Sequence, residues 1–533
     1  MTASDKRFAL LSLSDKEGLS SLAQAFVDAG IHLMATGGTY QALKEADLPV
    51  QAVEDFTGVK EMLDGRVKTL HPKIHGGLLA DRSKPDHLAT MADQAIPNIA
   101  FLVVNLYPFA EVVAQDASNF DRAIENIDIG GPTMLRSAAK NHASLTVLTD
   151  KRDYPLVMEE LKAQGKTSLS TRSYLASKVF QLTAHYDQEI ANYLAQAKQG
   201  QVSDQGQDWP FISQTYDLKA SLPYGENSQQ KAWFYTDGQA SQASVAGAKQ
   251  VNGKALSFNN IKDADVATNM LADFPDQATA IAIKHMTPCG VGRGDNIHQA
   301  FDRCYQADSK SIYGGIVSFN QVVDERLAQS LSKIFLEIIV APGFTDSALA
   351  ILTKKKKLRL LEIDLPEKNQ ARPQQVSVSG GLLIQEPDQS TELDFPLGQK
   401  PSQWTYYGED QYKSDDLQTM AFLMKVVKYV KSNAIVVGAG QMTLGVGGGQ
   451  PNRVNSAQIA LEEMKAKDLE TDGKIILASD AFIPMRDTVD LASQYGVDVI
   501  VQPGGSIHDD DVIAACQEKG IDLVMTGYRH FKH

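Results

Sequence analysis

The sequence predicts an α/β protein that contains more than one domain. Apolar runs with the length of strands alternate with amphipathic segments with the spacing of helices, starting with residues 7–14 and 16–30. This alternation is typical of a mostly parallel sheet covered by helices. The chain has 533 residues, of which 43% are hydrophobic and 22% charged, and this ordinary globular composition supports about two to four domains.

The N-terminal part of the chain has the clearest alternation. Further strands are predicted at residues 31–36, 97–109 and 144–150, and residues 151–200 have a helical pattern. Residues 197–208 are polar and rich in Gly and Gln, which predicts a linker.

The arrangement of predicted strands and helices changes from about residue 210 onward. Strand-like segments, such as residues 280–285 and 473–480, mix with helical ones, such as residues 416–432. A polar stretch at 366–378 is expected to separate two lobes, and no internal repeat is strong enough to identify. The four lysines 354–357 are interpreted as a solvated surface stretch. The predicted domains are residues 1–150, a helical connection and linker over 151–208, and a C-terminal region over 209–533 with lobes of about 209–370 and 371–533.

Composition excludes several classes of protein. The formal net charge of −14 argues against nucleic acid as a partner, and no stretch approaches the roughly 20 apolar residues that a membrane span requires. We also expect no signal peptide. The three cysteines form no CxxC pair, so a disulfide framework and a cysteine-rich zinc site are not expected, and a cytoplasmic location fits. We predict no metal site, since His71 and His75 lie beside a proline and two glycines that disrupt a helical metal face.

Four N-terminal segments combine flexible or strand-end backbone with polar or charged groups. They are Ser14–Lys16, Thr36–Thr39, Arg66–Thr69 and Asp128–Gly131. Strand ends in parallel α/β sheets face the ligand crevice, and glycine lets backbone N–H groups approach an anion closely. Taken alone, each segment is an ordinary turn or exposed strand end. Their joint occurrence in one domain favours a phosphate-bearing ligand.

Longer stretches in the same region resemble a known family. SDKEG, ATGGT, DGRVKTLHPKIHGG, NLYPF and IDIGGPTMLRSAAKNH occur in the order found in IMP cyclohydrolase domains, which have a methylglyoxal-synthase-like fold. The resemblance implies that formyl-AICAR, an aminoimidazole-carboxamide ribonucleotide, is cyclised to IMP. It assigns nucleotide binding to Ser14, Asp15, Lys16, Thr36, Gly37, Gly38, Thr39, Arg66, Val67, Thr69, Asn105 and Ile129, and catalysis to Lys68, Lys140, Tyr107 and Asp128.

The implied cyclisation needs positioning more than strong chemistry. A carboxamide nitrogen attacks a neighbouring formyl carbon, and water then leaves, so near-attack geometry supplies much of the rate. A lysine ammonium can stabilise developing oxyanion charge, and a second lysine or Asp128 can move protons. The sequence leaves open which group donates and which accepts.

Lys284 and His285 form the most suggestive pair in the C-terminal region. They follow an apolar strand, and a neighbouring lysine disfavours the imidazolium, which leaves the neutral form that a general base needs. Adjacent strand residues point to opposite faces, so both reach one substrate only if the strand ends there. The alternative is a strand-end histidine with no role.

The surroundings of this pair resemble the formyltransferase domain of the same bifunctional family. The segments include KHMTPCG, YGENSQQ, YGGIVSFN, ASDAFIPMRD and the terminal YRHFKH, and the fold implied is that of a zinc-free cytidine deaminase. The resemblance implies a homodimer that formylates AICAR, with 10-formyltetrahydrofolate as a cosubstrate and no tightly bound cofactor. It assigns catalysis to Lys284, His285 and Asn433, nucleotide binding to Tyr224, Gly314, Glu337, Arg453, Phe482 and Arg529, and folate binding to Val454, Asp487 and Thr488.

Several positions depart from the family pattern, including Tyr313 and Met485, and two of them bear on the nucleotide site. Pro223 stands where many members have an arginine of the nucleotide site, and Gln229 stands where many have a histidine. These changes keep open a cyclohydrolase with a weakened transferase half. A nucleotide-binding regulatory protein is the third hypothesis, and retention of Lys68, Lys140 and the Lys284–His285 pair speaks against it.

Overall fold

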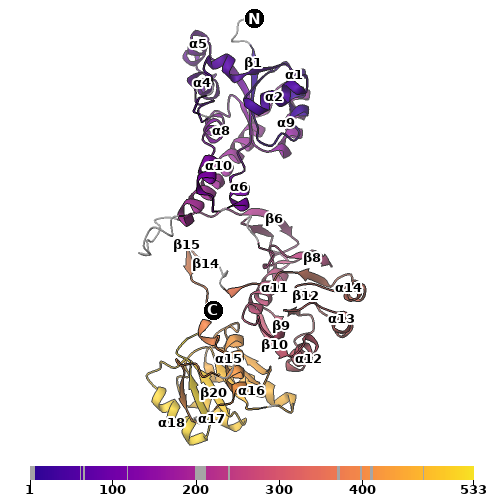
Figure 1. Ribbon diagram of the computed structural model, residues 1–533, viewed down its shortest axis with the longest axis vertical. Helices are drawn as coiled ribbons and strands as arrows, with labels where there is room; N and C mark the ends of the chain where they lie inside the picture. The colour runs from indigo at the N-terminus through magenta and orange to yellow at the C-terminus, as the bar shows by residue number, and fades with distance from the viewer. Residues whose placement is uncertain are drawn as a thin grey trace. The chain divides into compact units, whose positions relative to one another are not determined.

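The chain divides into two compact units, Met1–Thr215 and Tyr216–His533. The computed structural model describes residues 6–60, 62–63, 66–116, 118–197, 212–237, 241–368, 373–396, 399–408, 412–471 and 473–533. The predicted linker at 197–208 therefore lies almost wholly outside the described residues, as does part of the polar stretch at 366–378. Each unit is described by itself (Figure 1).

The first unit is built on a five-stranded parallel sheet with the order β3-β2-β1-β4-β5. The strands are β1 (Arg7–Ser12), β2 (His32–Ala35), β3 (Val50–Ala52), β4 (Asn98–Val104) and β5 (Thr146–Leu148). The strand order reverses at β1, and in such sheets ligands bind beyond the carboxyl ends of the strands on either side of the reversal.

Helices cover both faces of this sheet. Alternate residues of β1 point to opposite sides, so Ala9 and Leu11 join one core and Phe8 and Leu10 join the other. The first core also takes α1 (Leu19–Asp28), α2 (Gly37–Glu45) and α9 (Tyr154–Gln164), and the second takes α4 (Pro72–Leu79), α8 (Gly130–Lys140) and part of α10 (Leu169–Ala197). The described residues of this unit also form α3 (Val53–Thr57), α5 (Pro85–Asp93), α6 (Phe109–Gln115), α7 (Phe120–Glu125) and a 3-10 turn at Lys151–Asp153.

The second unit contains a twelve-stranded mixed sheet with a repeat that the sequence did not reveal. Its order is β16-β21-β20-β19-β17-β18-β10-β9-β11-β12-β13-β8, so corresponding strands lie at equal distances from the central pair β10 and β18. The first repeat contains β8 (Lys249–Asn252), β9 (Ala278–Lys284), β10 (Thr287–Gly294), β11 (Ile316–Phe319), β12 (Ile338–Ala341) and β13 (Arg359–Glu362). The second contains β16 (Thr405–Tyr407), β17 (Ile435–Ala439), β18 (Met442–Gly447), β19 (Ile476–Ser479), β20 (Val499–Gln502) and β21 (Asp522–Met525).

The helices follow the same repeat. Helices α11 (Phe258–Leu271) and α15 (Ser414–Val427) each follow the first strand of their repeat, β8 or β16, and share one continuous core. On the opposite face, each repeat has its own core. The first is formed by α12 (Ile297–Ala307), α13 (Glu325–Leu331) and α14 (Asp346–Leu352), and the second by α16 (Arg453–Lys467), α17 (Asp487–Gln494) and α18 (Asp509–Lys519).

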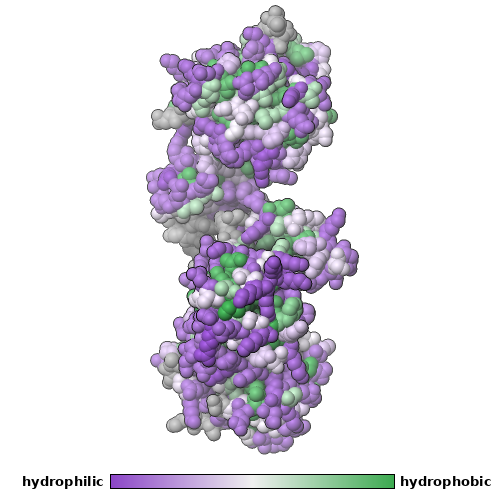
Figure 2. Space-filling model, turned by 90° about the vertical axis from the view of Figure 1, so that its right-hand side faces the viewer, coloured by the Kyte–Doolittle hydropathy of each residue, from purple (hydrophilic) through white to green (hydrophobic). Residues whose placement is uncertain are grey.

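Two short hairpins lie outside the large sheet. They pair β6 (Asp217–Leu222) with β7 (Ala232–Thr236), and β14 (Gln374–Val378) with β15 (Gly381–Gln385). The second of these hairpins is exposed along both of its strands. On the face seen in Figure 2, hydrophilic residues predominate, and hydrophobic ones form small groups.

Glycines allow the helix after each central strand to lie unusually close. A Cβ at Gly290 or Gly292 would overlap backbone of α12, and one at Gly445 or Gly447 would overlap backbone of α16. The two GVG motifs, at residues 290–292 and 445–447, are therefore packing motifs of β10 and β18. Their correspondence was the available signal for the repeat.

We predict that Gly445→Ala destabilises the second unit by about 3 kcal/mol, because the added Cβ would overlap the carbonyl oxygen of Ala460. Gly343→Ala is the matched control, since its Cβ would lie 3.8 Å from the nearest side-chain atom. Chemical denaturation followed by the fluorescence of buried Trp404 measures both. Equal stability of the two variants would contradict the close packing.

Candidate active sites

Two loops at the carboxyl end of β1 and β4 are tied together in the first unit. The backbone N–H of Ser14 donates to Asn105 Oδ1 at 2.5 Å, and Asn105 Nδ2 donates to the Asp15 carbonyl at 2.8 Å. Lys16 Nζ lies 3.3 Å from the Ser14 carbonyl oxygen. Asn105 therefore holds the backbone of the loop that carries Lys16.

Helix α2 begins beside this loop, with Thr36 as its N-cap. Thr36 Oγ1 donates to Ser12 Oγ at 2.8 Å, and Thr39 Oγ1 accepts the Leu13 N–H at 2.8 Å. Gly37 has a φ of +40°, and a Cβ there would lie 3.0 Å from Lys68 Nζ. A Cβ on Gly38 would lie 3.8 Å from Lys16 Nζ.

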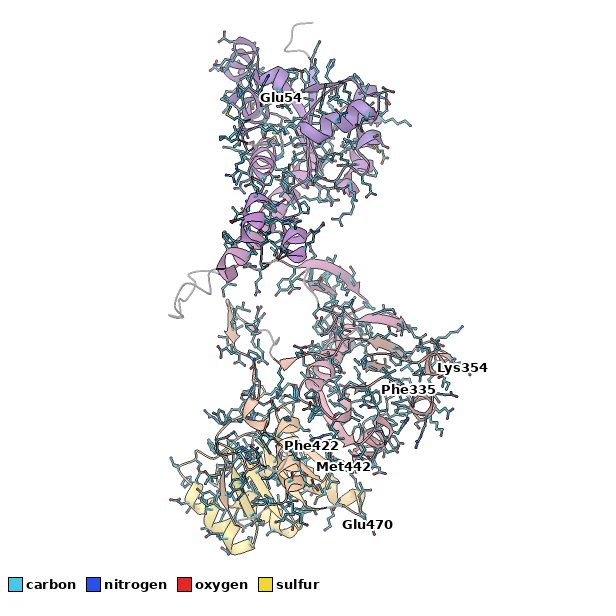
Figure 3. The ribbon with its side chains drawn as sticks, viewed as in Figure 1. Glu54, Phe335, Lys354, Phe422, Met442 and Glu470 are labelled. Atoms are coloured by element: carbon cyan, nitrogen blue, oxygen red, sulfur yellow. The ribbon has the colours of Figure 1, made fainter. Side chains whose placement is uncertain are left out.

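Two lysine ammonium groups therefore lie beside the N-terminus of one helix. A helix N-terminus presents unpaired N–H groups and partial positive charge, so this arrangement suits an anion. A cavity of about 160 Å³ opens at this point, lined by residues that include Thr36, Gly37, Glu54 and Lys68. Figure 3 labels Glu54 in this unit.

Asp128 lies at the start of α8. Its Oδ1 accepts the Gly131 N–H at 2.8 Å, and a Cβ on Gly131 would overlap the carboxylate, so only glycine fits there. Burial raises the pKa of Asp128, and backbone N–H groups of Gly131 and Tyr107 oppose that rise. A Cβ on Gly130 would lie 3.1 Å from Thr69 Oγ1, which places the 66–69 segment beside this helix start.

The other predicted residues of the first unit are placed differently. Tyr107 and Ile129 are 55% and 59% exposed, Val67 forms an isolated bridge with Met62, and Arg66 pairs with Glu125. Lys140 ends α8, ten residues after Gly130, which is about 15 Å along the helix. Within this unit, Lys140 therefore lies at the opposite end of α8 from Asp128, and its catalytic role stays a prediction.

In the second unit, β9 ends at Lys284 and β10 begins at Thr287. His285 and Met286 form a two-residue hairpin turn with φ values of +53° and +60°. Positive φ at both central residues is a type I′ turn, which normally takes Asn and Gly, and each non-glycine residue there costs of order 1–3 kcal/mol. Strand β9 therefore ends at Lys284, as is needed if Lys284 and His285 are to reach one substrate.

Neighbouring elements hold this turn on several sides. The Met286 N–H donates to Asp263 Oδ1 at 2.7 Å, and Lys532 Nζ donates to the Met286 carbonyl at 3.3 Å. Lys284 Nζ donates to the Tyr313 carbonyl at 2.6 Å. The His285 side chain is exposed, so the strained turn presents an imidazole to solvent while its backbone is fixed.

A large cavity adjoins the first repeat. It has a volume of about 1110 Å³, and Tyr224, Tyr313 and Glu337 line it. Gly314 has a φ of +70°, and a Cβ there would lie 3.4 Å from Lys284 Nζ. Glu337 forms an ion pair with Arg359 at 2.7 Å. Tyr224 and Glu337 therefore line one cavity with Tyr313, and Lys284 contacts the Tyr313–Gly314 backbone beside it.

A second cluster lies in the second repeat. Asn433 Oδ1 accepts from Arg453 Nη2 at 2.9 Å, and Asn433 Nδ2 donates to the Gln450 carbonyl at 3.0 Å. Arg453 is only 6% exposed and also pairs with buried Asp480. The Arg453 guanidinium is thus already bound to Asp480 and Asn433. To bind a phosphate, it would have to give up these contacts.

Predicted folate residues flank this cluster. Val454 follows Arg453 on α16, and Asp487 and Thr488 begin α17. Thr488 is fully buried, whereas Asp487 is exposed and accepts the Thr488 N–H at 2.7 Å. Phe482 lies in the loop after β19 and is partly exposed. These assignments remain predictions.

The C-terminal tail connects the two clusters. Lys532 contacts the carbonyl oxygens of Met286 and Tyr429, and its own carbonyl accepts the Ser432 N–H at 2.8 Å. The exposed Arg529 precedes His530, whose N–H donates to the Asp480 carbonyl at 2.9 Å. Asp263 and Lys532 were missed from sequence, because only the fold shows that they contact the turn.

Within the described residues, no group of three His, Cys, Asp or Glu side chains could hold a metal ion. His71 instead caps α4, with its Nδ1 accepting the Lys73 N–H at 3.1 Å. None of the described helices has the length and hydropathy of a membrane span.

His530, in the C-terminal tail, makes the stability of the second unit depend on pH. Its Nδ1 lies 2.7 Å from Asp388 Oδ2 and its Nε2 lies 3.0 Å from Glu392 Oε1, although the second approach lacks hydrogen-bond geometry. Burial lowers the pKa of His530, but the two carboxylates outweigh it and raise the pKa to about 9. The stabilisation is therefore complete below the ordinary histidine pKa and is lost as pH rises through about 9.

We predict that the free energy of unfolding of the second unit falls by up to about 3 kcal/mol between pH 6 and pH 10 through this group. His530→Ala should remove that decline, and His508→Ala, with an exposed side chain, is the control. Denaturation at a series of pH values measures it. An unchanged decline in His530→Ala would show that another group is responsible.

Models of two known protein families match parts of both compact units. A model of the AICARFT/IMPCHase bienzyme family matches residues 138–463, and a model of the MGS-like domain matches residues 18–133. These matches confirm the predicted α/β fold class, with a methylglyoxal-synthase-like parallel sheet first.

Curated relatives extend over the whole chain. The bifunctional purine biosynthesis protein PurH of Lactobacillus acidophilus is 48% identical over 526 residues, which cover 98% of this chain and 99% of the relative. PurH of Halalkalibacterium halodurans is also 48% identical, over 99% of this chain and 100% of the relative. The crystal structure of ForH is 35% identical over 36% of this chain and 99% of that chain, with a TM-score of 0.32, which supports no argument about fold. The chain belongs to the AICARFT/IMPCHase bienzyme family, and it is a bifunctional enzyme of purine biosynthesis with formyltransferase and cyclohydrolase activities.

Proposed function

We propose that the two activities use separate sites, one in each compact unit. The second unit transfers a formyl group from 10-formyltetrahydrofolate to the amino group of AICAR, and the first unit closes formyl-AICAR to IMP with loss of water. The observation that carries this division is that each unit has its own cavity lined by cationic side chains, Lys68 in the first unit and six lysines with Arg359 in the second. We propose residues 1–150 as the cyclohydrolase domain and 209–533 as the transferase region.

In the first unit, Lys16, Lys68 and the start of α2 hold an anionic part of the nucleotide. The geometry around Gly37 supports this role, because a bulkier residue would press on Lys68 Nζ. Lys68 then stabilises negative charge on the attacked formyl oxygen. Asp128 accepts a proton as the carboxamide nitrogen attacks, which suits a buried carboxylate with a raised pKa.

In the second unit, His285 removes a proton from the amine of AICAR as it attacks the formyl carbon. That amine is a weak nucleophile, because its lone pair is delocalised into the ring, so a general base is a sensible device. Lys284 stabilises the oxyanion of the tetrahedral intermediate. The fixed backbone of the turn supports this assignment, since a base must be held within hydrogen-bond reach of its proton.

We also propose a homodimer in the cytoplasm, with folate as a cosubstrate and no resident cofactor. The three free cysteines support a reducing compartment, and burial raises the pKa of Cys304 and Cys516, which keeps both as thiols. The partners are small-molecule substrates.

The assignment predicts a split between two variants. His285→Ala should lower formyl transfer by about 10²–10⁴-fold and leave cyclisation of supplied formyl-AICAR intact. Lys68→Ala should lower cyclisation by about 10²–10³-fold and accumulate formyl-AICAR from AICAR.

Separate assays of AICAR consumption and IMP formation measure this split. His508→Ala and Lys162→Ala are matched controls on exposed positions of the same units, and both should retain the two activities. If His285→Ala transferred formyl groups normally, its role as the base would be wrong.

Asp128 predicts a pH profile. Burial raises its pKa, so cyclisation should decline, as pH falls, at a higher pH than an ordinary carboxylate would give. Asp128→Asn should lower the rate and remove this acidic limb, measured from pH 4 to pH 8 with supplied formyl-AICAR. Retention of the limb in Asp128→Asn would exclude Asp128 as its source.

A further inference from the structure

The cavity of the first repeat is bordered by far more positive charge than its predicted ligands explain. Seven cationic side chains line it, against one carboxylate, Glu337. Six of them are lysines, namely Lys254, Lys333, Lys354, Lys355, Lys356 and Lys357. The sequence interpretation of residues 354–357 as a solvated surface stretch therefore misses their position on a cavity wall.

Most of this charge is not neutralised by the protein. Arg359 pairs with Glu337, and Lys355 Nζ donates to the Ile334 carbonyl at 2.7 Å. Around the other five lysines, no carboxylate of the described residues lies within ion-pair distance, and all five are exposed. Because the chain as a whole carries a net charge of −14, such a local excess is not a consequence of composition.

Three segments that are distant in sequence create this excess. Lys254 follows β8, Lys333 follows α13, and Lys354–Lys357 follow α14. Figure 3 labels Phe335 and Lys354, which come from the second and third of these segments, and both line the cavity. Like charges repel, so the fold brings them together at a cost that a bound anion would remove.

The rest of the cavity wall suits a ligand with a ring beside its anion. Tyr313 and Phe335 are 62% and 46% exposed, and their ring centroids lie 5.2 Å apart. Tyr313 also accepts the hydrogen bond from Lys284 Nζ through its carbonyl, which connects the cavity to the reacting groups. The position that is often arginine in the family is Pro223, which lines the same cavity and offers no charge.

We propose that Lys254, Lys333 and Lys354–Lys357 form a subsite for a multiply charged anionic group of a transferase substrate. This inference rests on the proposed function of the second unit. Two substrates carry such chemistry: the nucleotide has a phosphate monoester, and a folate with a glutamate tail has a series of carboxylates. In either case the lysines supply the positive charge that Pro223 lacks.

The test uses the full-length chain with Lys354, Lys356 and Lys357 replaced by Gln. Lys355 is kept, because its ammonium also holds the Ile334 carbonyl. The control is the triple Gln variant of exposed Lys44, Lys162 and Lys166 in the first unit, which changes the net charge equally. A second variant with Arg at 354, 356 and 357 retains the charge.

Formyl transfer is followed with AICAR and with 10-formyltetrahydrofolate carrying one or five glutamates. We expect the Gln variant to raise one KM by about 10- to 100-fold, with kcat within about twofold, and the Arg variant to restore it. A higher KM for AICAR identifies the phosphate, and a higher KM for the pentaglutamate cosubstrate alone identifies the carboxylates. The affected KM of the unsubstituted enzyme should also rise with ionic strength, and less steeply in the Gln variant.

The inference is overturned if every KM of the Gln variant stays within about twofold of that of the unsubstituted enzyme, or if the first-unit control changes KM equally. Cyclisation of supplied formyl-AICAR and Trp404 fluorescence show that each preparation is active and folded. Absence of formyl transfer in the unsubstituted enzyme would instead refute the proposed function.

Discussion

The close approach of two helices to the central strand pair is the constraint on which the second unit depends. Helices α12 and α16 pack against β10 and β18 at distances that only glycine permits, and these two strands join the repeats into one sheet. Protein interiors are packed so tightly that an added atom displaces its neighbours. The paired strands therefore fix the register between the repeats.

That register brings His285 and Asn433, the candidate catalytic residues, to one edge of the sheet. Neighbouring strands in the order β9-β10-β18-β17 are antiparallel, so the end of β9 and the start of β17 lie at the same edge of the sheet. The turn at His285 leaves the sheet at that edge, Asn433 enters it there, and Lys532 contacts backbone on both sides. A strained turn supported in this way is rigid, which suits a group that must meet a proton at a defined place.

Much of the fold was predictable from the sequence. The strands at residues 31–36 and 97–109 and the helix near 416–432 were found because burial imposes periodicity on them. The repeat was missed because its signal is not periodicity but matched glycines beside two helices. In the first unit Gly37 and Lys68 lie together, and in the second unit Lys284 contacts Tyr313, each at a strand end where ligand groups were predicted.

Other parts of the sites depend on tertiary contacts that no local pattern encodes. The family resemblance assigned Arg453 to nucleotide binding, but its burial against Asp480 follows from the packing of the second repeat and not from a local pattern. Lys140 matched a catalytic motif, yet the direction of α8 carries it away from Asp128. The lysines at 354–357 resembled a solvated stretch because the cavity that they border is formed by two other segments.

The two activities are proposed to reside at separate sites. Formyl-AICAR is the product of the transferase site and the substrate of the cyclohydrolase site. The most direct test of this division mixes the His285→Ala and Lys68→Ala proteins with AICAR and 10-formyltetrahydrofolate and measures IMP. The account predicts that the mixture forms IMP at a rate that increases with the concentration of either protein, although neither protein forms it efficiently alone. Failure of the mixture to form IMP, with each protein retaining its other activity, would contradict the account.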